Sequence, residues 1–131
     1  MASIFSKIIS GEIPCYKVAE TANCLAFLDI YPIARAHTLV IPKKEVDNIF
    51  DLEEPLYSDL FLLAKKIASG IEKIENCAKV GVAVVGLEVP HAHIHLIPIN
   101  GVYDIDFRKT KLKFTPEEFS EIAFEIAAAM D

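Results

Sequence analysis

The 131-residue sequence is poor in cysteine, has no long hydrophobic run and carries no excess of basic residues. Its three cysteines, Cys15, Cys24 and Cys77, are odd in number and form no Cys-x-x-Cys pair, which argues against a disulfide framework and a cysteine zinc knuckle. No apolar stretch approaches the ~20 residues of a membrane span, and polar residues interrupt the first 14, which lack a signal-peptide core. We therefore expect a cytoplasmic protein with no membrane partner.

The formal net charge of −6 argues against a nucleic-acid partner, because sequence-independent binding of DNA needs a basic surface. A small anionic ligand is still compatible, since a pocket can be rich in donors while the whole chain is acidic. The only basic cluster, Arg108, Lys109, Lys111 and Lys113, is interpreted as a solvated edge. The hydrophobic content of 53% is high for a small soluble chain, and this surplus apolar surface predicts a homodimer.

The length predicts a single domain over residues 1–131 with a real core. Apolar residues recur with helical period in IFSKII, between Asp51 and Asn76, and after the capping signal that begins at Thr115. Between these helices lie short runs of strand-forming residues, CLAFLDI, HTLVIP and residues 79–99, the last divided into two strands by a bend or turn marked by Gly86 and Pro90. The pattern predicts an α+β fold with a central antiparallel sheet, a long helix and a C-terminal helix.

Three of the four histidines occupy alternate positions in one apolar segment, VPHAHIHLIP. On a β-strand, His91, His93 and His95 would share one side of the sheet, each roughly 6.6 Å from the next. The apolar residues between them would then pack on the core. We therefore expect the histidine side to face a cleft.

Three chemical interpretations fit this spacing. Core histidines with satisfied hydrogen bonds are one, although three buried imidazoles require three sets of partners. A zinc site is the second, with a further ligand from Glu88, Asp104 or Asp106. The third is nucleophilic, because neutral imidazole can attack phosphorus while its neighbours donate hydrogen bonds to phosphate oxygens. Spacing alone does not decide between metal and phosphate.

The segment HAHIHLI fits the pattern His-x-His-x-His followed by two apolar residues, and the chain resembles the histidine triad family. The segments IFSKIISGEIP, CLAFLDIYPIARAHTLVIPKK and GLEVPHAHIHLIP follow the order and spacing of its branch of nucleotide phosphoramidases and dinucleoside polyphosphate hydrolases. All four histidines fall on matched positions. The resemblance implies the histidine triad fold, an edge-to-edge homodimer and a reaction that needs no cofactor or metal.

The resemblance also implies a purine nucleotide substrate, an adenosine phosphoramidate or a dinucleoside polyphosphate, whose α-phosphate lies at the histidines. His93 matches the nucleophile that forms a nucleotidyl-histidine, and His95 matches the residue that hydrogen-bonds the phosphate. His91 and His37 match histidines that orient and stabilise the site. Asp29 matches the acid that binds the ribose hydroxyls. The residues that match the apolar walls around the base are Ile4, Phe5, Phe27 and Ile30.

The sequence departs from the family pattern at several positions. Leu87 stands where glutamine is common, so a hydrogen bond to the phosphate or the leaving group is lost or supplied otherwise. Glu88 replaces a hydroxyl residue and is interpreted as facing solvent rather than as an acid for a leaving amine. Ser3 and Ser6 stand where some bacterial relatives bind zinc through Cys-x-x-Cys, and serine is a poor zinc ligand. Two alternatives stay open: a nucleotide-binding or scaffold protein with little turnover, and a metal-dependent hydrolase with the three histidines as ligands.

Overall fold

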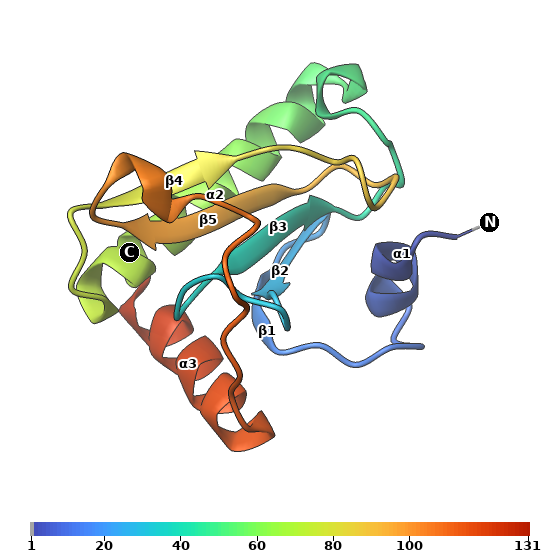
Figure 1. The fold of residues 1–131 in the computed structure, drawn as a ribbon. Helices are drawn as coiled ribbons and strands as arrows, with labels where there is room; N and C mark the ends of the chain where they lie inside the picture. The colour runs from blue at the N-terminus through green and yellow to red at the C-terminus, as the bar shows by residue number, and fades with distance from the viewer. Residues whose placement is uncertain (1) are drawn as a thin grey trace.

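The computed structural model describes residues 2–131 as three helices and one five-stranded sheet, with two short 3-10 turns. The elements follow the order α1 (Ile4–Ile9), β1 (Lys17–Glu20), β2 (Cys24–Leu28), β3 (Thr38–Pro42), η1 (Ile49–Asp51), α2 (Glu54–Ile74), β4 (Lys79–Ala83), β5 (Ile94–Ile99), η2 (Val102–Asp104) and α3 (Pro116–Ala129). Every strand pair is antiparallel, in the order β1-β2-β3-β5-β4 (Figure 1). The predicted α+β class with a central antiparallel sheet is confirmed.

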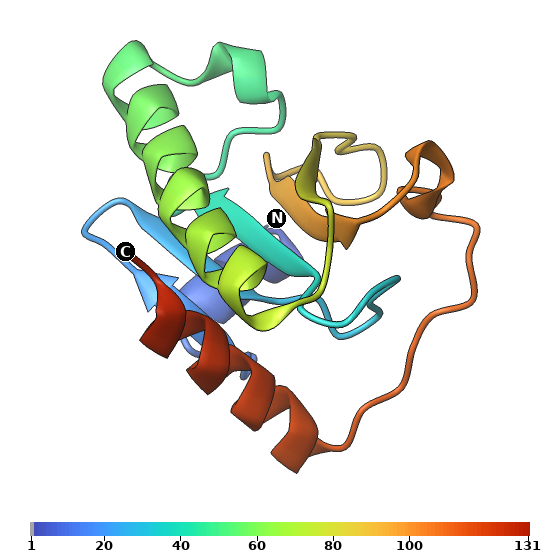
Figure 2. The same ribbon diagram turned by 90° about the vertical axis from the view of Figure 1, so that its left-hand side faces the viewer.

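Two of the interior strands, β2 and β3, are buried on both sides of the sheet. On one side, Cys24, Ala26 and Val40 pack in the main core with residues of α2 and α3. On the other side, Phe27 and its neighbours pack against Phe5 of α1. Figure 2 shows this arrangement, with α2 and α3 on one side of the sheet and α1 on the other. Burial on both sides explains why these strands read as continuous apolar runs.

Of the two long helices, α3 begins at the capping signal that the sequence displays, whereas the N-cap residue of α2, Glu53, makes no side-chain capping hydrogen bond. In α3, the Thr115 hydroxyl accepts from the Glu118 amide at 3.1 Å, and the Glu118 carboxylate accepts from the Thr115 amide at 2.8 Å, a reciprocal capping box. The helix predicted over 51–76 is shorter at both ends, because η1 and an extended Glu53 precede it and Glu75 already leaves helical geometry. No helix within residues 2–131 combines the length and the apolar character needed to cross a membrane.

The strand predicted to carry the three histidines begins later than expected. β5 starts at Ile94, so His91 and His93 lie in the segment just before it and only His95 is in the strand. The intervening apolar residues pack as predicted, with Ala92 and Ile94 both in the main core.

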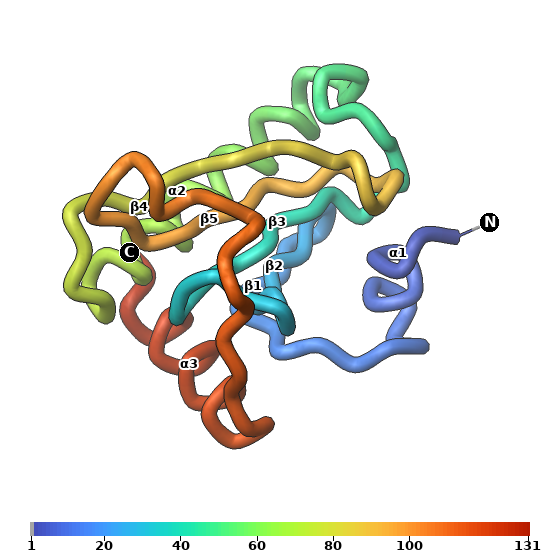
Figure 3. The backbone as a smooth tube through the Cα atoms, viewed as in Figure 1, coloured from blue at the N-terminus to red at the C-terminus, as the bar shows by residue number. Residues whose placement is uncertain are grey.

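The chain between β5 and α3 has little regular structure and runs back along the sheet. After η2 it passes the loop between β2 and β3, where the Leu112 amide donates to the Pro32 carbonyl at 2.8 Å. Figure 3 shows this segment, residues 105–112, crossing beside that loop before α3 begins. We call it the strap.

Candidate active site

A cavity of about 530 Å³ lies on the side of the sheet that carries α1. Such a volume is typical of small-molecule sites. The cavity brings together most of the residues predicted for the site: Ile4, Phe5, Phe27, Asp29, Ile30, His93 and His95. The two other predicted residues, His37 and His91, are almost fully buried and do not line it. The site therefore consists of two histidines at the cavity and two behind them.

His93 is held in one tautomer by the backbone before β5. Its Nδ1 lies 2.7 Å from the His91 carbonyl oxygen, which can only accept, so Nδ1 carries the proton and neutral His93 has its lone pair on Nε2. Within residues 2–131, every buried side-chain nitrogen has a hydrogen-bond partner. Nε2 of His93 has none, so this atom is not buried and is open to the cavity that His93 lines. The Phe5 ring packs edge-on against the imidazole, with centroids 5.0 Å apart. His93 thus offers an unprotonated nitrogen to a ligand.

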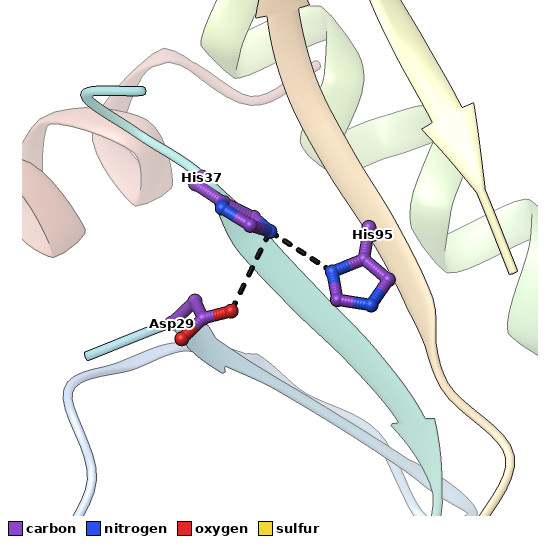
Figure 4. Close-up of side chains that lie close together, drawn as sticks. All are labelled: Asp29, His37 and His95. Atoms are coloured by element: carbon purple, nitrogen blue, oxygen red, sulfur yellow. Dashed lines mark hydrogen bonds and ion pairs between the residues drawn. The ribbon is translucent and has the colours of Figure 1, made fainter. Parts of the chain in front are cut away.

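His95 is oriented by a hydrogen-bond chain that begins at a backbone amide. The Ile33 amide donates to Nδ1 of His37 at 3.2 Å, so neutral His37 carries its proton on Nε2. That nitrogen lies 2.9 Å from Nδ1 of His95 and 3.6 Å from Oδ2 of Asp29 (Figure 4). Because His95 accepts at Nδ1, its own proton is on Nε2. The cavity therefore has a lone pair on His93 and an N–H donor on His95, with ring centroids 5.0 Å apart.

Burial keeps the imidazole rings of His37 and His95 neutral. Loss of hydration lowers the pKa of His37 to about 4, and the nearby Lys111 ammonium acts in the same direction. Burial, with repulsion from His37 and His93, lowers the pKa of His95 to about 3. Both rings are consequently uncharged at pH 7, as the hydrogen-bond chain requires.

His91 occupies a different place from the one expected. It is fully buried, its Nδ1 accepts from the Ser3 hydroxyl at 2.8 Å, and its Nε2 donates to the Pro42 carbonyl at 2.8 Å. The prediction that all three triad histidines face one cleft is therefore wrong for His91. Its carbonyl nevertheless fixes the His93 tautomer, and its role in orienting the site stays a prediction.

The residues that could hold a metal in this structure differ from the three triad histidines predicted as ligands. Within residues 2–131, the group whose ligand atoms come within 4.8 Å of one another is Asp29, His37 and His95, not the triad. A metal on Nε2 of His37 would require its deprotonation, while the Ile33 amide already donates to Nδ1. Because His37 would have to become an imidazolate, this group fits a hydrogen-bond relay better than a metal site.

Sequence reasoning missed two residues of the strap. Phe107 packs its ring 4.8 Å from that of His95, and Lys111 lines the cavity. The interpretation of the basic cluster as a solvated edge agrees with the exposure of Arg108, Lys109 and Lys113 but is wrong for Lys111. No periodic pattern marks this irregular segment, so nothing in the sequence places these two side chains at the histidines.

Two of the four residues that depart from the family pattern, Leu87 and Glu88, line the cavity. Leu87 is 89% exposed and Glu88 is exposed, and both line the cavity from the loop between β4 and β5. Glu88 faces solvent as interpreted, but it does so at the mouth of the site. Leu87 offers no hydrogen bond there.

The comparisons with known proteins agree with this geometry. A family model described as the HIT domain matches residues 10–101. The chain is 36% identical over 130 residues to an adenosine 5'-monophosphoramidase of Schizosaccharomyces pombe, covering 98% of both chains. A HIT-like protein of Bartonella henselae has a similar solved structure, with a TM-score of 0.85 and 32% identity, covering 98% of this chain and 96% of that one.

A zinc-bound histidine triad family protein of Mycobacterium smegmatis is also similar, with a TM-score of 0.81 and 27% identity over 98% of this chain and 93% of that one. The start of α1 does not fit a zinc site here, because Ser3 and Ser6 offer hydroxyls instead of thiolates and both nitrogens of His91 have protein partners.

Two findings show the family of this chain. The HIT-domain model matches residues 10–101, and the likeness to the Schizosaccharomyces pombe enzyme covers 98% of both chains. The chain therefore belongs to the HIT-domain, or histidine triad, family.

Proposed function

We propose that this protein is a nucleotide hydrolase or nucleotidyl transferase that attacks the α-phosphorus of a purine nucleotide through a nucleotidyl-histidine on His93. The observation that carries the proposal is the unprotonated Nε2 of His93 beside the N–H donor of His95 at one cavity. Relatives from Schizosaccharomyces pombe and Candida albicans, 36% and 39% identical, are named adenosine 5'-monophosphoramidases, which supports this chemistry.

In the first step, the His93 lone pair forms a bond to the α-phosphorus, and the bond to the leaving group breaks with its electron pair; a polyphosphate leaves as an oxyanion, and an amine takes up a proton from solvent as it leaves. The His91 carbonyl accepts from Nδ1–H and so stabilises the positive charge that develops on the imidazole. The His95 N–H donates to a phosphate oxygen. Water then attacks phosphorus, the N–P pair returns to His93, and a proton passes to solvent as the nucleoside monophosphate is released.

The rest of the cavity suits a nucleoside. Asp29 uses Oδ1 to accept from the Tyr31 amide at 2.9 Å, and its remaining lone pairs can accept from ribose hydroxyls. Phe5 and Phe27, whose centroids lie 5.7 Å apart, form an apolar wall on which a purine can pack, with Ile4 and Ile30 exposed at the rim.

The covalent route is tested by intact-protein mass spectrometry after quenching without acid, using an adenosine phosphoramidate. We expect a mass gain of one nucleotidyl group in wild type, no gain in His93→Ala, and a loss of turnover of several orders of magnitude. His93→Asn is expected to retain nucleotide binding, because the fold and the phosphate contacts persist. Turnover by His93→Asn at the wild-type rate would show that the mechanism is wrong.

A binding or scaffold protein with little turnover is the second candidate, and the exposed Leu87 favours it, because that position offers no hydrogen bond to a leaving group. Steady-state rates separate the two candidates. A catalyst loses its turnover in His93→Ala, whereas a binding protein has little turnover to lose in wild type.

We also propose that two chains pair through β4. This strand lies at the edge of the sheet, and apolar side chains are exposed along it and just after it, with Val82 54% and Val85 52% exposed. Such an edge is a template for pairing with a second strand. A cytoplasmic location stays a prediction of the sequence.

A further inference from the structure

Among the cavity-lining residues in the described part of the chain, 2–131, Lys111 is the only lysine or arginine. The two other charged groups there, Asp29 and Glu88, are carboxylates. Without Lys111, Asp29 and Glu88 would leave the cavity wall with negative charge and no lysine or arginine to offset it.

The strap holds Lys111 at the histidines through contacts on both sides of the residue. The Leu112 amide is tied to the Pro32 carbonyl at 2.8 Å, and the Phe107 ring packs 4.8 Å from His95 and 6.4 Å from His37. The Lys111 ammonium itself donates to the Phe107 and Lys109 carbonyls. The side chain is half-buried, so its reach is limited by packing as well as by these hydrogen bonds.

No carboxylate neutralises this ammonium. Within residues 2–131, no acid lies within 4 Å of Lys111, whereas the acid of the same strap, Asp106, pairs with Arg108 at 3.0 Å. The two carbonyl acceptors are neutral and leave the full charge in place. The Lys111 ammonium also acts on the buried His37 ring, where it adds to the larger effect of burial in lowering the His37 pKa.

On the basis of the function proposed above, we infer that Lys111 determines leaving-group specificity and favours substrates whose leaving group is an anionic polyphosphate chain. When His93 attacks the α-phosphorus, a polyphosphate departs with the P–O electron pair as an oxyanion, which an ammonium stabilises directly. An amine departs with the P–N pair and must collect a proton, so a fixed positive charge gives it no comparable help. Lys111 thus supplies from the strap an interaction that Leu87 cannot provide.

The test compares kcat/KM for diadenosine tetraphosphate and for adenosine 5'-phosphoramidate in four proteins: wild type, Lys111→Met, Lys111→Arg and Lys109→Met. We expect Lys111→Met to lower the value for the polyphosphate by about 10- to 100-fold, the range of one charge-assisted hydrogen bond. The value for the phosphoramidate should change far less. Lys111→Arg should restore most of the loss, and Lys109→Met, which removes an exposed cation from the same strap, should leave both values unchanged.

Equal losses on the two substrates in Lys111→Met, or a greater loss on the phosphoramidate, would overturn the inference. In either case an active wild type that depends on His93 leaves the proposed function standing. A wild type that hydrolyses neither nucleotide would instead refute the proposed function, and the role of Lys111 with it.

Discussion

His37 and His95 lie side by side in the protein interior as neutral rings, and the hydrogen-bond chain through them leaves no site for an extra proton. A proton on His37 would have to enter at Nδ1, where the Ile33 amide already donates. A proton on His95 would enter at Nδ1, which accepts from His37. Protonation of either ring therefore breaks a hydrogen bond as well as burying a charge.

This arrangement predicts a loss of stability in mild acid. The pKa values of His37 and His95 in the folded protein, about 4 and about 3, lie below the ordinary value near 6.5, so the unfolded chain binds more protons between these limits. Their contribution is fully present above pH 6.5 and is lost as the pH falls towards 4. At pH 5, one such histidine lowers the free energy of unfolding by about 2 kcal/mol. We expect urea denaturation to give a free energy of unfolding at least about 2 kcal/mol lower at pH 5 than at pH 7.

Between pH 7 and pH 5, the free energy of unfolding changes through the histidines and not through the acids with lowered pKa values. Glu20 and Glu45, whose pKa values are lowered to about 2 by hydrogen bonds, release their contribution only below about pH 4.5. A free energy of unfolding that stays constant from pH 7 to pH 5 would contradict the neutral, buried pair.

At the scale of elements, the contact between α2 and α3 depends on Gly70. A Cβ at this position would lie 2.6 Å from the backbone oxygen of Ile126 and 3.1 Å from the Met130 side chain. Glycine inside a helix costs about 1 kcal/mol relative to alanine, but relief of a backbone clash requires the whole of α3 to shift. The packing effect outweighs the gain in helix propensity.

We therefore expect Gly70→Ala to lower the free energy of unfolding by up to about 2 kcal/mol in chemical denaturation, the usual range for overpacking less the propensity gain. Ser58→Ala is the matched control, because Ser58 is exposed on the same helix and gains propensity without a clash. A Gly70→Ala protein as stable as the control variant would show that α3 adapts freely.

The elements that the sequence predicted well are those whose burial follows a regular period. The α2 helix has the 3.6-residue pattern, and β2 and β3 are apolar except for Thr38 because both of their sides are covered. β1 was missed because only Val18 of its four residues is buried, so no alternation marks it. The triad strand was predicted too long, since alternation continues into the segment before Ile94, which makes a backbone hydrogen bond from Ala92 to Val46 and lies outside the strand ladder.

The residues of the candidate site likewise fall into those that the sequence could predict and those that it could not. Asp29, His93 and His95 lie in short motifs that the sequence displays, and the cavity brings them together. Lys111 could not be placed, because its position depends on the path of an irregular segment and on contacts distant in the chain. The Ser3 hydroxyl, which binds His91 across 88 positions of sequence, escaped prediction for the same reason.

At the scale of the molecule, the apolar edge at β4 predicts the oligomeric state. We expect sedimentation equilibrium at micromolar concentration to give about twice the 14.5 kDa chain mass. Val82→Lys should shift the protein towards monomer, because a charge on an edge strand blocks pairing. Phe124→Lys, an equally drastic change at an exposed site on α3, should leave the mass unchanged. A wild-type mass of 14.5 kDa would exclude the dimer.

The sheet itself consists of two parts that are local in sequence, β1-β2-β3 and β4-β5, joined only by the pairing of β3 with β5. His37 immediately precedes β3 and His95 lies in β5, so the relay between them spans the join. Because this pairing must close a loop of about fifty residues, its entropy cost favours late formation during folding. A chain that has formed both parts separately already has most of its secondary structure but no oriented His95. Recovery of activity during refolding therefore reports the closing of the sheet, which circular dichroism would register much less.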